Sequence, residues 1–306
     1  MIYTCTLNPA IDYRMVLDTF KEGSLNRATS TSLFPGGKGI NVSIVLKALG
    51  KKSRILGFEG GFTGSHLKHM LSESFGLDPW FTHIKDRTRI NLKLSLKSGE
   101  TEINAPAPSV SREEYETFMS EVKNIEKGDV LVLAGSDIDN RFNTYETLAK
   151  HCFDNNIPFV IDSEKDNVTK VLKYEPLLLK PNLYELETIF NRKLDDEKAI
   201  VKAAYHLIEE GAKHIIISLG SDGAYFVTKY GVYKAAPVKG EVKNTVGAGD
   251  SMVAGFLESY MEDENPYKAF KRAVAAAGAT VVTERLAEKN TIDALEASIE
   301  IEEVPL

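Results

Sequence analysis

The sequence predicts an α/β fold built on a mainly parallel sheet, with a small second sheet at one edge. From residue 129 onward, short apolar runs alternate with longer segments of helical period, which is typical of strand and helix units around a parallel sheet. Two other segments, at about residues 11–34 and 86–106, contain strand patterns instead, and these are expected to form the small sheet.

Six apolar runs are expected to be strands of the large sheet. The four that lie beyond residue 129 are continuous and end in polar or glycine residues, as buried parallel strands do. In chain order, the six runs are residues 2–7, 53–58, 129–135, 157–162, 176–182 and 214–220.

Amphipathic segments between and after these strands are expected to be helices. They are residues 143–156 and 196–211, followed by helical stretches near 249–262, 266–284 and 291–300. No internal repeat or low-complexity linker interrupts residues 1–306, so the sequence predicts a single domain.

The small sheet is predicted most clearly by strict alternation in residues 90–97. The apolar residues of this strand are Ile90, Leu92, Leu94 and Leu96. Arg89 and Asn91 share its polar face, because successive side chains of a strand point to opposite sides. A lid over a cleft is the natural interpretation, and a plain extension of the large sheet is the alternative. A thin lid can bury its apolar face on a second copy, so a homodimer through the lid is expected.

Composition and charge exclude several classes of protein. The net charge is -7 and the longest basic runs are pairs such as Lys51-Lys52, so no nucleic-acid or anionic-membrane partner is expected. Cys5 and Cys152 are interpreted as reduced thiols in the core. The N-terminus lacks a charged leader and no run of about 18 apolar residues occurs, so a cytoplasmic protein is expected.

The segment NTVGAGDSMVAGF, residues 244–256, combines a glycine loop with a carboxylate at the start of a helix. Gly247 and Gly249 would let an anion approach backbone amides that have no partner within the helix. The helix start is expected to keep Asp250 ionised, so that it accepts a proton from a hydroxyl held beside the anion. The alternative is an ordinary aspartate after a glycine turn.

Two other glycine motifs do not fit the chain. A dinucleotide fingerprint needs a third glycine where Met252 stands. A Walker A loop needs a glycine where Ser32 stands and a serine or threonine where Gly39 follows Lys38.

A second glycine loop lies in FPGGKGINVSIVLKALG, residues 34–50, ahead of another apolar helix face. Lys38 would meet an anion at this helix start, and Asn41 offers a donor and acceptors for sugar hydroxyls. A lysine on a flexible surface loop is the alternative.

Two turns after strands complete the candidate site. In LLLKPNLYELE, Asn182 and Glu185 share a helix face after Lys180, which suits Mg²⁺ directly or through water. Capping of the helix by the same two residues is the alternative, and both functions are compatible. In SLGSDGAYF, Gly220 and Gly223 form a tight turn with room for a nucleotide, or a plain turn.

Six of these motifs resemble those of the ribokinase-like sugar kinases, in particular the phosphofructokinase B branch. In order, they are TLNPAID, GGKGINV, RTRINLKL, LKPNLYELE, SLGSDGA and TVGAGDS, and they span nearly the whole chain. The resemblance implies a ribokinase-like three-layer sandwich with a β lid. It also implies transfer of a phosphoryl group from ATP to a sugar-phosphate hydroxyl, with Mg²⁺ as cofactor.

The resemblance assigns a role to each matching residue. Asp250 is implied as catalytic base, Lys38 as a catalytic cation, and Gly247, Ala248 and Gly249 as the anion hole. The implied sugar-phosphate site consists of Asp12, Gly37, Lys38, Asn41, Arg89, Asn91 and Ser136. The implied nucleotide site consists of Lys180, Asn182, Glu185, Ser218, Gly220, Gly223, Thr245, Gly247 and Gly249, with Asn182 and Glu185 holding Mg²⁺, mainly through water.

The sequence departs from the family at two places. Relatives often have glycine-serine-leucine-proline where this chain has GSDIDN, so Ser136 is kept but is followed by Asp137 and Ile138. The segment TERLAEKN lacks a glycine that relatives often carry beside the adenine pocket, and the residues that contact the base are therefore not named.

Within the branch, fructose 1-phosphate is the expected substrate. Lys38 fits the 1-phosphofructokinases and the tagatose-6-phosphate kinases, and RTRINLKL looks most like the former. Tagatose 6-phosphate and fructose 6-phosphate are the alternatives. A sugar-phosphate sensor without catalytic activity is the alternative from a different class.

Overall fold

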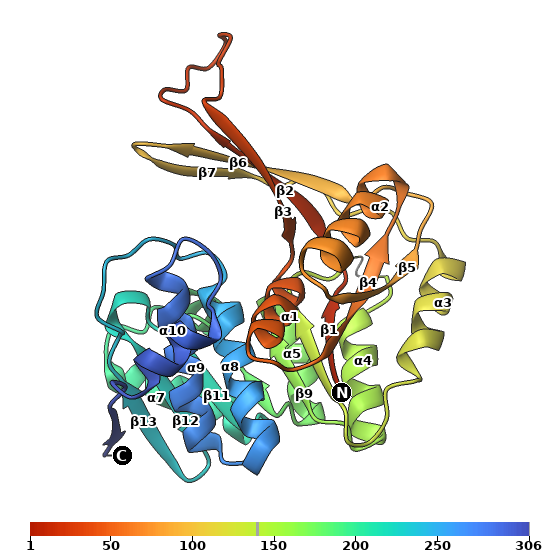
Figure 1. Cartoon of the computed structure of the whole chain (residues 1–306). Helices are drawn as coiled ribbons and strands as arrows, with labels where there is room; N and C mark the ends of the chain where they lie inside the picture. The colour runs from red at the N-terminus through yellow and green to blue at the C-terminus, as the bar shows by residue number, and fades with distance from the viewer. Residues whose placement is uncertain (139–140, 306) are drawn as a thin grey trace.

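A ten-stranded sheet crosses the molecule (Figure 1) within residues 1–138 and 141–305, which the computed structural model describes. Its strands are β1 (Ile2–Thr6), β4 (Ser53–Glu59), β5 (Asp78–His83), β8 (Val130–Ala134), β9 (Phe159–Asp162), β10 (Leu178–Leu179), β11 (His214–Ser218), β12 (Ala224–Thr228), β13 (Gly231–Ala235) and β14 (Ile301–Val304). Their order is β14-β13-β12-β11-β10-β9-β8-β1-β4-β5. Neighbours from β11 to β5 are parallel, and β12 to β14 add an antiparallel end, so the predicted mainly parallel sheet is confirmed.

Helices cover both faces of this sheet. They are α1 (Lys38–Ala48), α2 (Gly61–His69), α3 (Arg112–Val122), α4 (Thr144–Asp154), α5 (Lys165–Val171), α6 (Leu183–Phe190), α7 (Glu197–Glu209), α8 (Ala248–Asp263), α9 (Pro266–Val281) and α10 (Lys289–Glu296). A π-helical turn (Met70–Ser74) continues α2, and 3₁₀ turns lie at Leu172–Tyr174 and Gly220–Asp222. One apolar cluster joins α3 to α7 to the sheet, and another joins α1, α8, α9 and α10 to it. The molecule is therefore a three-layer sandwich.

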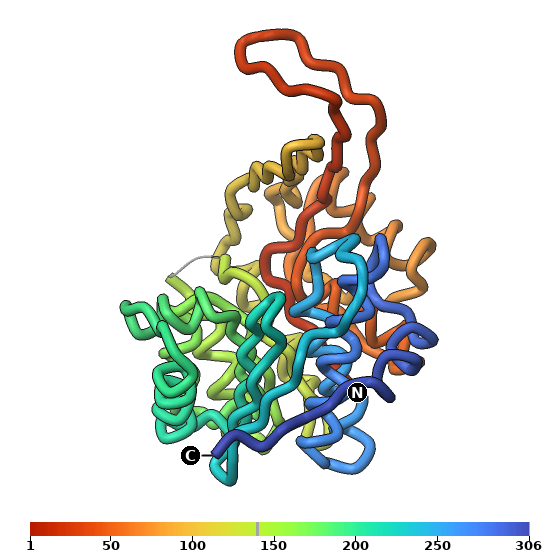
Figure 2. The backbone as a smooth tube through the Cα atoms, turned by 90° about the vertical axis from the view of Figure 1, so that its left-hand side faces the viewer, coloured from red at the N-terminus to blue at the C-terminus, as the bar shows by residue number. Residues whose placement is uncertain are grey.

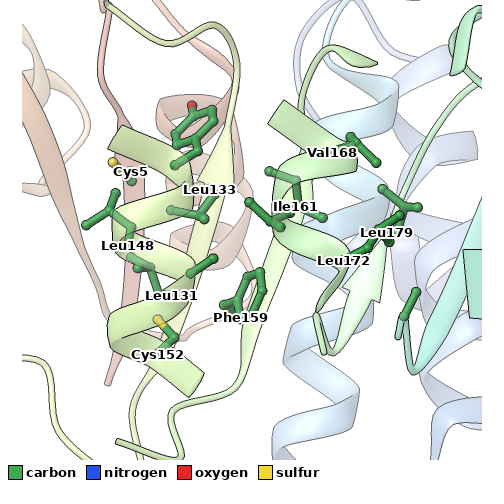
Figure 3. Close-up of a cluster of buried hydrophobic side chains, with 14 of the residues drawn as sticks. Cys5, Leu131, Leu133, Leu148, Cys152, Phe159, Ile161, Val168, Leu172 and Leu179 are labelled. Carbon is green, nitrogen blue, oxygen red and sulfur yellow. The ribbon is translucent and has the colours of Figure 1, made fainter. Parts of the chain in front are cut away.

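Strand β8 shows why the central strands have continuous apolar runs. Leu131 and Leu133 belong to the cluster on one face, whereas Val130 and Val132 belong to the cluster on the other. Both faces are covered, so every position along the strand must be apolar. Figure 3 shows the first of these clusters, which includes Cys5 and Cys152. Both cysteines are buried and free, as the sequence analysis expected.

A separate four-stranded sheet projects from this body (Figures 1 and 2). Its strands are β2 (Ala10–Val16), β3 (Ser30–Gly36), β6 (Arg89–Leu96) and β7 (Gly99–Ile103), in the order β3-β2-β6-β7. The two inner strands pair in parallel and the outer strands are antiparallel to them. The predicted small sheet is therefore present, and its four strands lie within about two residues of the expected segments 11–34 and 86–106, although β7 was not expected as a separate strand.

Some predicted elements are shorter than expected. The run at 176–182 contains only the two-residue strand β10, because Pro176 and Pro181 lack the N–H that a sheet ladder requires. The last helix ends at Glu296 instead of residue 300, since the following residues form β14 against β13. No helix of the described residues is long and apolar enough to cross a membrane.

A buried arginine holds the three C-terminal helices together. Arg272 on α9 donates from Nε to Glu258 on α8 over 2.9 Å, and from Nη1 to Asp293 and Glu296 on α10 over 2.7 Å each. Its side chain is 7% exposed, so the guanidinium group is buried, although Asp293 and Glu296 are 45% and 32% exposed. Helix α8, which carries Asp250 in its first turn, is thereby fixed against α9 and α10.

Candidate active site

A cleft of about 1200 Å³ lies at the carboxyl ends of the parallel strands, between the large and small sheets. This is the expected place for a ligand in an open α/β sheet. Every site residue that the sequence analysis named lines this cleft, although the residues come from both ends of the chain.

The glycine loop before α8 has the geometry that the sequence suggested. Gly247 has a φ of 79°, in the left-handed region that favours glycine, and a Cβ there would lie 2.4 Å from Leu286 Cδ2. A Cβ at Gly249 would lie 2.9 Å from Lys180 Nζ. A side chain at Gly247 would strain the backbone and displace Leu286, and one at Gly249 would displace the ammonium group of Lys180.

The backbone amides of this loop differ in what they contact. The Ala248 amide donates to Thr245 O over 3.4 Å, and the Ser251 amide donates to Gly247 O over 2.8 Å. The amides of Gly249 and Asp250 lie in the first turn of α8, where a helix supplies no acceptor. These two amides are therefore the best suited to bind an anion, because the Ala248 amide already donates to Thr245 O.

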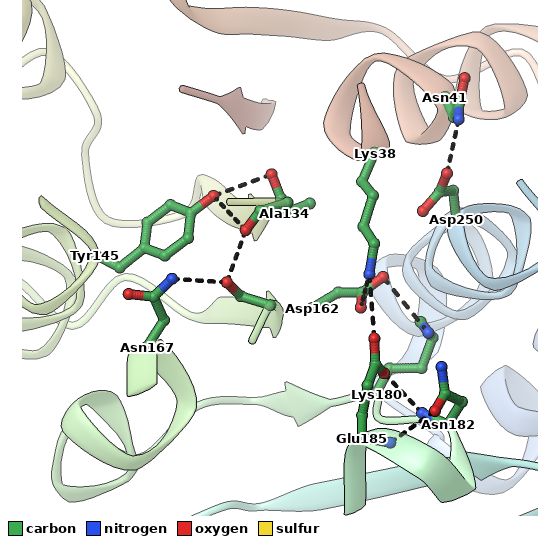
Figure 4. A network of polar contacts seen from close by, with 12 residues as sticks. Lys38, Asn41, Ala134, Tyr145, Asp162, Asn167, Lys180, Asn182, Glu185 and Asp250 are labelled. Atoms are coloured by element: carbon green, nitrogen blue, oxygen red, sulfur yellow. Dashed lines mark hydrogen bonds and ion pairs between the residues drawn. The ribbon is translucent and has the colours of Figure 1, made fainter. Parts of the chain in front are cut away.

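Asp250 is a buried carboxylate with one neutral hydrogen-bond donor. It is 5% exposed, and Asn41 Nδ2 donates to its Oδ2 over 2.7 Å (Figure 4). Burial and the nearby charge of Asp162 raise the pKa of Asp250 to about 6, although Asn41, Lys38 and Lys180 act in the opposite direction. The expected ionised state therefore holds above about pH 6 and fails in mild acid.

Asp162 is the centre of an ion-pair network at the end of β9 (Figure 4). Lys38 Nζ lies 2.9 Å from its Oδ1, and Lys180 Nζ lies 3.4 Å from its Oδ2. Burial raises the pKa of Asp162, but the two ammonium groups outweigh burial and hold it below its ordinary value. Lys38 also lies 3.6 Å from Glu185 Oε1, so it is no loose surface lysine.

Asp162 was not identified from the sequence as a candidate site residue. The residue closes a run that was correctly identified as a buried strand. A carboxylate at the carboxyl end of a parallel strand faces the ligand cleft, and this position was the signal that could have identified it.

Asn182 and Glu185 form a reciprocal capping box at the start of α6. The Glu185 amide donates to Asn182 Oδ1, and the Asn182 amide donates to Glu185 Oε2, both over 2.8 Å. Capping therefore accounts for the spacing of the two residues. Glu185 Oε1 remains directed toward Lys38 in the cleft. Among the described residues, no group of three or more His, Cys, Asp or Glu side chains is placed to hold a metal ion.

The small sheet contributes a polar face to the cleft. Asn91 Nδ2 donates to Asp12 Oδ1 over 3.0 Å, so the two residues expected in the sugar-phosphate site contact each other. Arg89 donates to the backbone oxygens of Asn8 and Ala105 over 3.2 and 3.0 Å. The backbone thus fixes its guanidinium group. Lys93, which the sequence analysis left unassigned, lines the same face.

Two other positions have structural reasons for their residues. A Cβ at Gly223 would lie 2.0 Å from Ala235 O, so the hairpin of β12 and β13 requires glycine there. Asp137 accepts from the Thr144 amide over 3.1 Å at the start of α4. This explains one of the two replacements after Ser136. Residues 139–140 of that motif lie outside the described part of the chain.

One end of the cleft is apolar and was not identified from the sequence. Its side chains come from α9 and from the segment between β13 and α8, and Lys239 of that segment lines the cleft beside them. They are Pro237, Val238, Val242, Val246, Val274, Ala277 and Val281. Nothing distinguished these residues from core residues in the sequence, because valine and alanine are common in both.

Comparison with known proteins agrees with this geometry. A family model for pfkB family carbohydrate kinases matches residues 6–292. The chain belongs to this family. The kinase is 41% identical over 306 residues to the 1-phosphofructokinase of Borreliella burgdorferi, with 99% of each chain covered. It is 32% identical over 312 residues to the tagatose-6-phosphate kinase of Staphylococcus epidermidis, covering 99% of this chain and 100% of that protein.

The fold of the kinase is also that of a solved relative. The structure of phosphofructokinase-2 from Escherichia coli in complex with substrates and products matches it with a TM-score of 0.91 and 28% identity. The match covers 97% of this chain and 98% of that one. The expected ribokinase-like fold and the expected phosphoryl transfer to a sugar hydroxyl are therefore confirmed.

The two buried aspartates of the kinase are expected to affect stability in opposite directions. The native pKa of Asp250, about 6, lies above its ordinary 3.8, so the wild type loses stability as pH rises through this interval. Asp250→Asn should therefore increase the free energy of unfolding at pH 8 by about 2–3 kcal/mol, and by about a third of that at pH 4.5. Urea denaturation at the two pH values measures this difference.

Asp162→Asn is the matched control. The native pKa of Asp162 lies below its ordinary value, so its charge stabilises the fold above that value. Its removal leaves two lysines unpaired and should cost about 3–5 kcal/mol at both pH values. A destabilised Asp250→Asn variant at pH 8 would contradict the electrostatic description.

Proposed function

We propose that this kinase transfers the γ-phosphoryl group of ATP to fructose 1-phosphate, giving fructose 1,6-bisphosphate. The observation that carries the proposal is the position of Asp250, a buried carboxylate beside the glycine loop at the start of α8. A hydroxyl held there would lie next to both a proton acceptor and the amides that stabilise an anion.

In the proposed reaction, the sugar hydroxyl oxygen attacks the γ-phosphorus while its proton passes to Asp250. The bond from the γ-phosphorus to the bridging oxygen breaks, and ADP leaves with that electron pair. The amides of Gly247, Ala248 and Gly249 are proposed to stabilise the phosphoryl oxygens. The Gly249 amide is the best suited of the three, because the Ala248 amide already donates to Thr245 O. Positioning and charge stabilisation then supply most of the catalysis.

Lys38 fits the role of a catalytic cation. Its ammonium lies between Asp162 and Glu185, and these carboxylates outweigh the effect of burial and raise its pKa above the ordinary value. The lysine therefore stays charged in the cleft. A fixed positive charge near Asp250 suits a reaction that transfers a negatively charged group.

The nucleotide is proposed to occupy the side of the cleft formed by β10, β11 and α9. Its phosphates would meet Lys180 and the glycine loop, and its ribose would meet residues of the turn after β11. The polar residues proposed for this side are Lys180, Asn182, Glu185, Ser218, Gly220, Gly223 and Thr245. The apolar end at Val238, Val246 and Val281 suits the flat face of a purine base.

The residues present fit a magnesium ion that is bound mainly by phosphates and water. Glu185 Oε1 faces the cleft 3.6 Å from Lys38 Nζ, whereas Asn182 Oδ1 is already used in the capping box. Mg²⁺ keeps several waters in such sites, so one carboxylate from the protein suffices. When bound, the ion neutralises negative charge on the phosphates of ATP.

The sugar phosphate is proposed to lie against the small sheet. Asp12, Asn41 and Asn91 offer acceptors and donors for its hydroxyls, and Arg89 offers a cation for its phosphate. Gly37 and Ser136 border the same space. Family membership and the intact Asp250 and Lys38 argue against a sensor without catalytic activity.

Comparison of three sugar phosphates tests the substrate assignment. We expect kcat/KM for fructose 1-phosphate to exceed that for tagatose 6-phosphate and fructose 6-phosphate by at least about tenfold, which needs only about 1.4 kcal/mol. A coupled assay of ADP formation under one condition measures all three. A clear lead for tagatose 6-phosphate would overturn the substrate while keeping the mechanism, and no sugar-dependent ADP formation would favour the sensor.

The outer face of the small sheet is proposed to form a homodimer. Leu33 on β3, Ile90 on β6 and Ile103 on β7 are 46%, 43% and 55% exposed, whereas Leu94 is buried within the chain. Three apolar residues on one thin sheet form a surface that a second copy would cover.

Light scattering at micromolar concentration tests this assembly. We expect twice the chain mass of 33.8 kDa for the wild type and a single chain mass for Leu33→Glu, because a charge there would be buried in the interface. Tyr230→Glu, on an 81% exposed residue outside the small sheet, should remain dimeric. A wild-type protein of single chain mass would remove the proposal.

A further inference from the structure

Lys93 reaches into the sugar side of the cleft from the middle of the small sheet. It lies two residues after Asn91 on β6, so the two side chains share one face of the strand. Across the sheet, Asn91 lies opposite Asp12 on β2, and Lys93 lies opposite Glu102 on β7. The side chain of Lys93 is only 15% exposed, although lysine is usually a surface residue.

The ammonium group of Lys93 bridges two carboxylates. Its Nζ lies 3.3 Å from Asp12 Oδ2 and 3.2 Å from Glu102 Oε1. Burial lowers the pKa of Lys93, but these two carboxylates outweigh burial and raise it above its ordinary value. The lysine therefore remains charged inside the cleft at neutral pH.

The surroundings of Asp12 leave little freedom to its carboxylate. Asn91 Nδ2 holds Oδ1, and Lys93 holds Oδ2. A Cβ at Gly36 would lie 2.5 Å from Asp12 Oδ1, so the carboxylate also packs directly against the neighbouring strand β3. Each oxygen of a carboxylate accepts about two hydrogen bonds, and each therefore keeps a lone pair for a sugar hydroxyl.

We propose that Lys93 is a positioning residue for the sugar phosphate, which acts by fixing the carboxylate of Asp12. The inference rests on the proposed function, since it takes Asp12 as the group that accepts hydrogen bonds from the sugar. A carboxylate that is already oriented loses less entropy when the sugar binds, which lowers KM without changing the reacting groups.

A direct contact between Lys93 and the phosphate of the sugar is the competing explanation. An ammonium group has three donors, and Asp12 and Glu102 occupy two of them. The two explanations differ in one measurable respect. A residue that acts through Asp12 has no effect once Asp12 is altered, whereas a residue that contacts the phosphate keeps its effect.

A double-mutant cycle with Lys93→Met and Asp12→Asn distinguishes them, with kcat and both KM values measured for wild type, single and double variants. We expect Lys93→Met to raise KM for fructose 1-phosphate at least about tenfold, while kcat and KM for ATP change less than about threefold. In the Asp12→Asn background, the same substitution should change kcat/KM less than about twofold. Lys93→Arg, which can still bridge two carboxylates, should lie within about threefold of the wild type.

The exposed Lys97, which follows β6, provides the matched control. Lys97→Met removes the same charge from the turn between β6 and β7 and should leave all parameters near the wild type. Thermal unfolding should show that each variant is folded. The inference would be overturned if the effects of Lys93→Met and Asp12→Asn on kcat/KM multiply in the double variant. It would also be overturned if either single variant keeps the wild-type KM for fructose 1-phosphate. If the wild type phosphorylates none of the three sugar phosphates, the proposed function fails first, which is a separate result.

Discussion

The active site depends on the unequal pairing of two buried aspartates with two lysines. Asp162 and Asp250 both lie in the cleft, and two carboxylates at close quarters cannot both ionise freely in a buried site. Lys38 and Lys180 contact Asp162, whereas the hydrogen-bond donor that Asp250 has among the described side chains is the neutral amide of Asn41. The pKa values of the two acids therefore move apart. Asp162 stays ionised at neutral pH and holds the lysines, and Asp250 becomes an acceptor that can take and release a proton near neutral pH.

The fold supplies this arrangement through strand ends and helix starts. Asp162 ends β9 and Lys180 follows β10, so the parallel sheet brings them to the same edge. Lys38 and Asp250 each lie in the first turn of a helix that follows a glycine loop. The sheet therefore positions Asp162 and Lys180, while the helix starts present Lys38 and Asp250, which are proposed to meet the phosphoryl group. The small sheet adds a polar face of its own, in which Asp12 is the fixed carboxylate.

Much of this architecture could be predicted from the sequence because strands and glycine loops have local signatures. The apolar run at 129–135 and the alternation at 90–97 each predicted a strand that the structure contains, and the glycine pattern before Asp250 predicted the start of α8. Helices α2, α3 and α5 and strands β5, β7, β13 and β14 were not predicted, since their segments are short or mostly polar.

The electrostatics of the site could not be predicted from the sequence. The raised pKa of Asp250 depends on Asp162, which is 88 positions earlier in the chain (250 − 162), and on burial by elements that only the fold brings together. Lys93 illustrates the same limit. The alternation of residues 90–97 placed Lys93 on the polar face of the strand, but the contact of Lys93 with Asp12 depends on the pairing of β2 with β6. The apolar end of the cleft has no local signature.

The proposed phosphoryl transfer depends on Asp250 as the proton acceptor. The most direct test is kcat of Asp250→Asn at pH 8 with saturating ATP and fructose 1-phosphate, because asparagine keeps the shape of the side chain but accepts no proton. We expect kcat to fall by several orders of magnitude, of which at least about a hundredfold is due to the lost general base. The affinity for ATP should stay near that of the wild type. A fall in kcat of less than about tenfold would contradict the account.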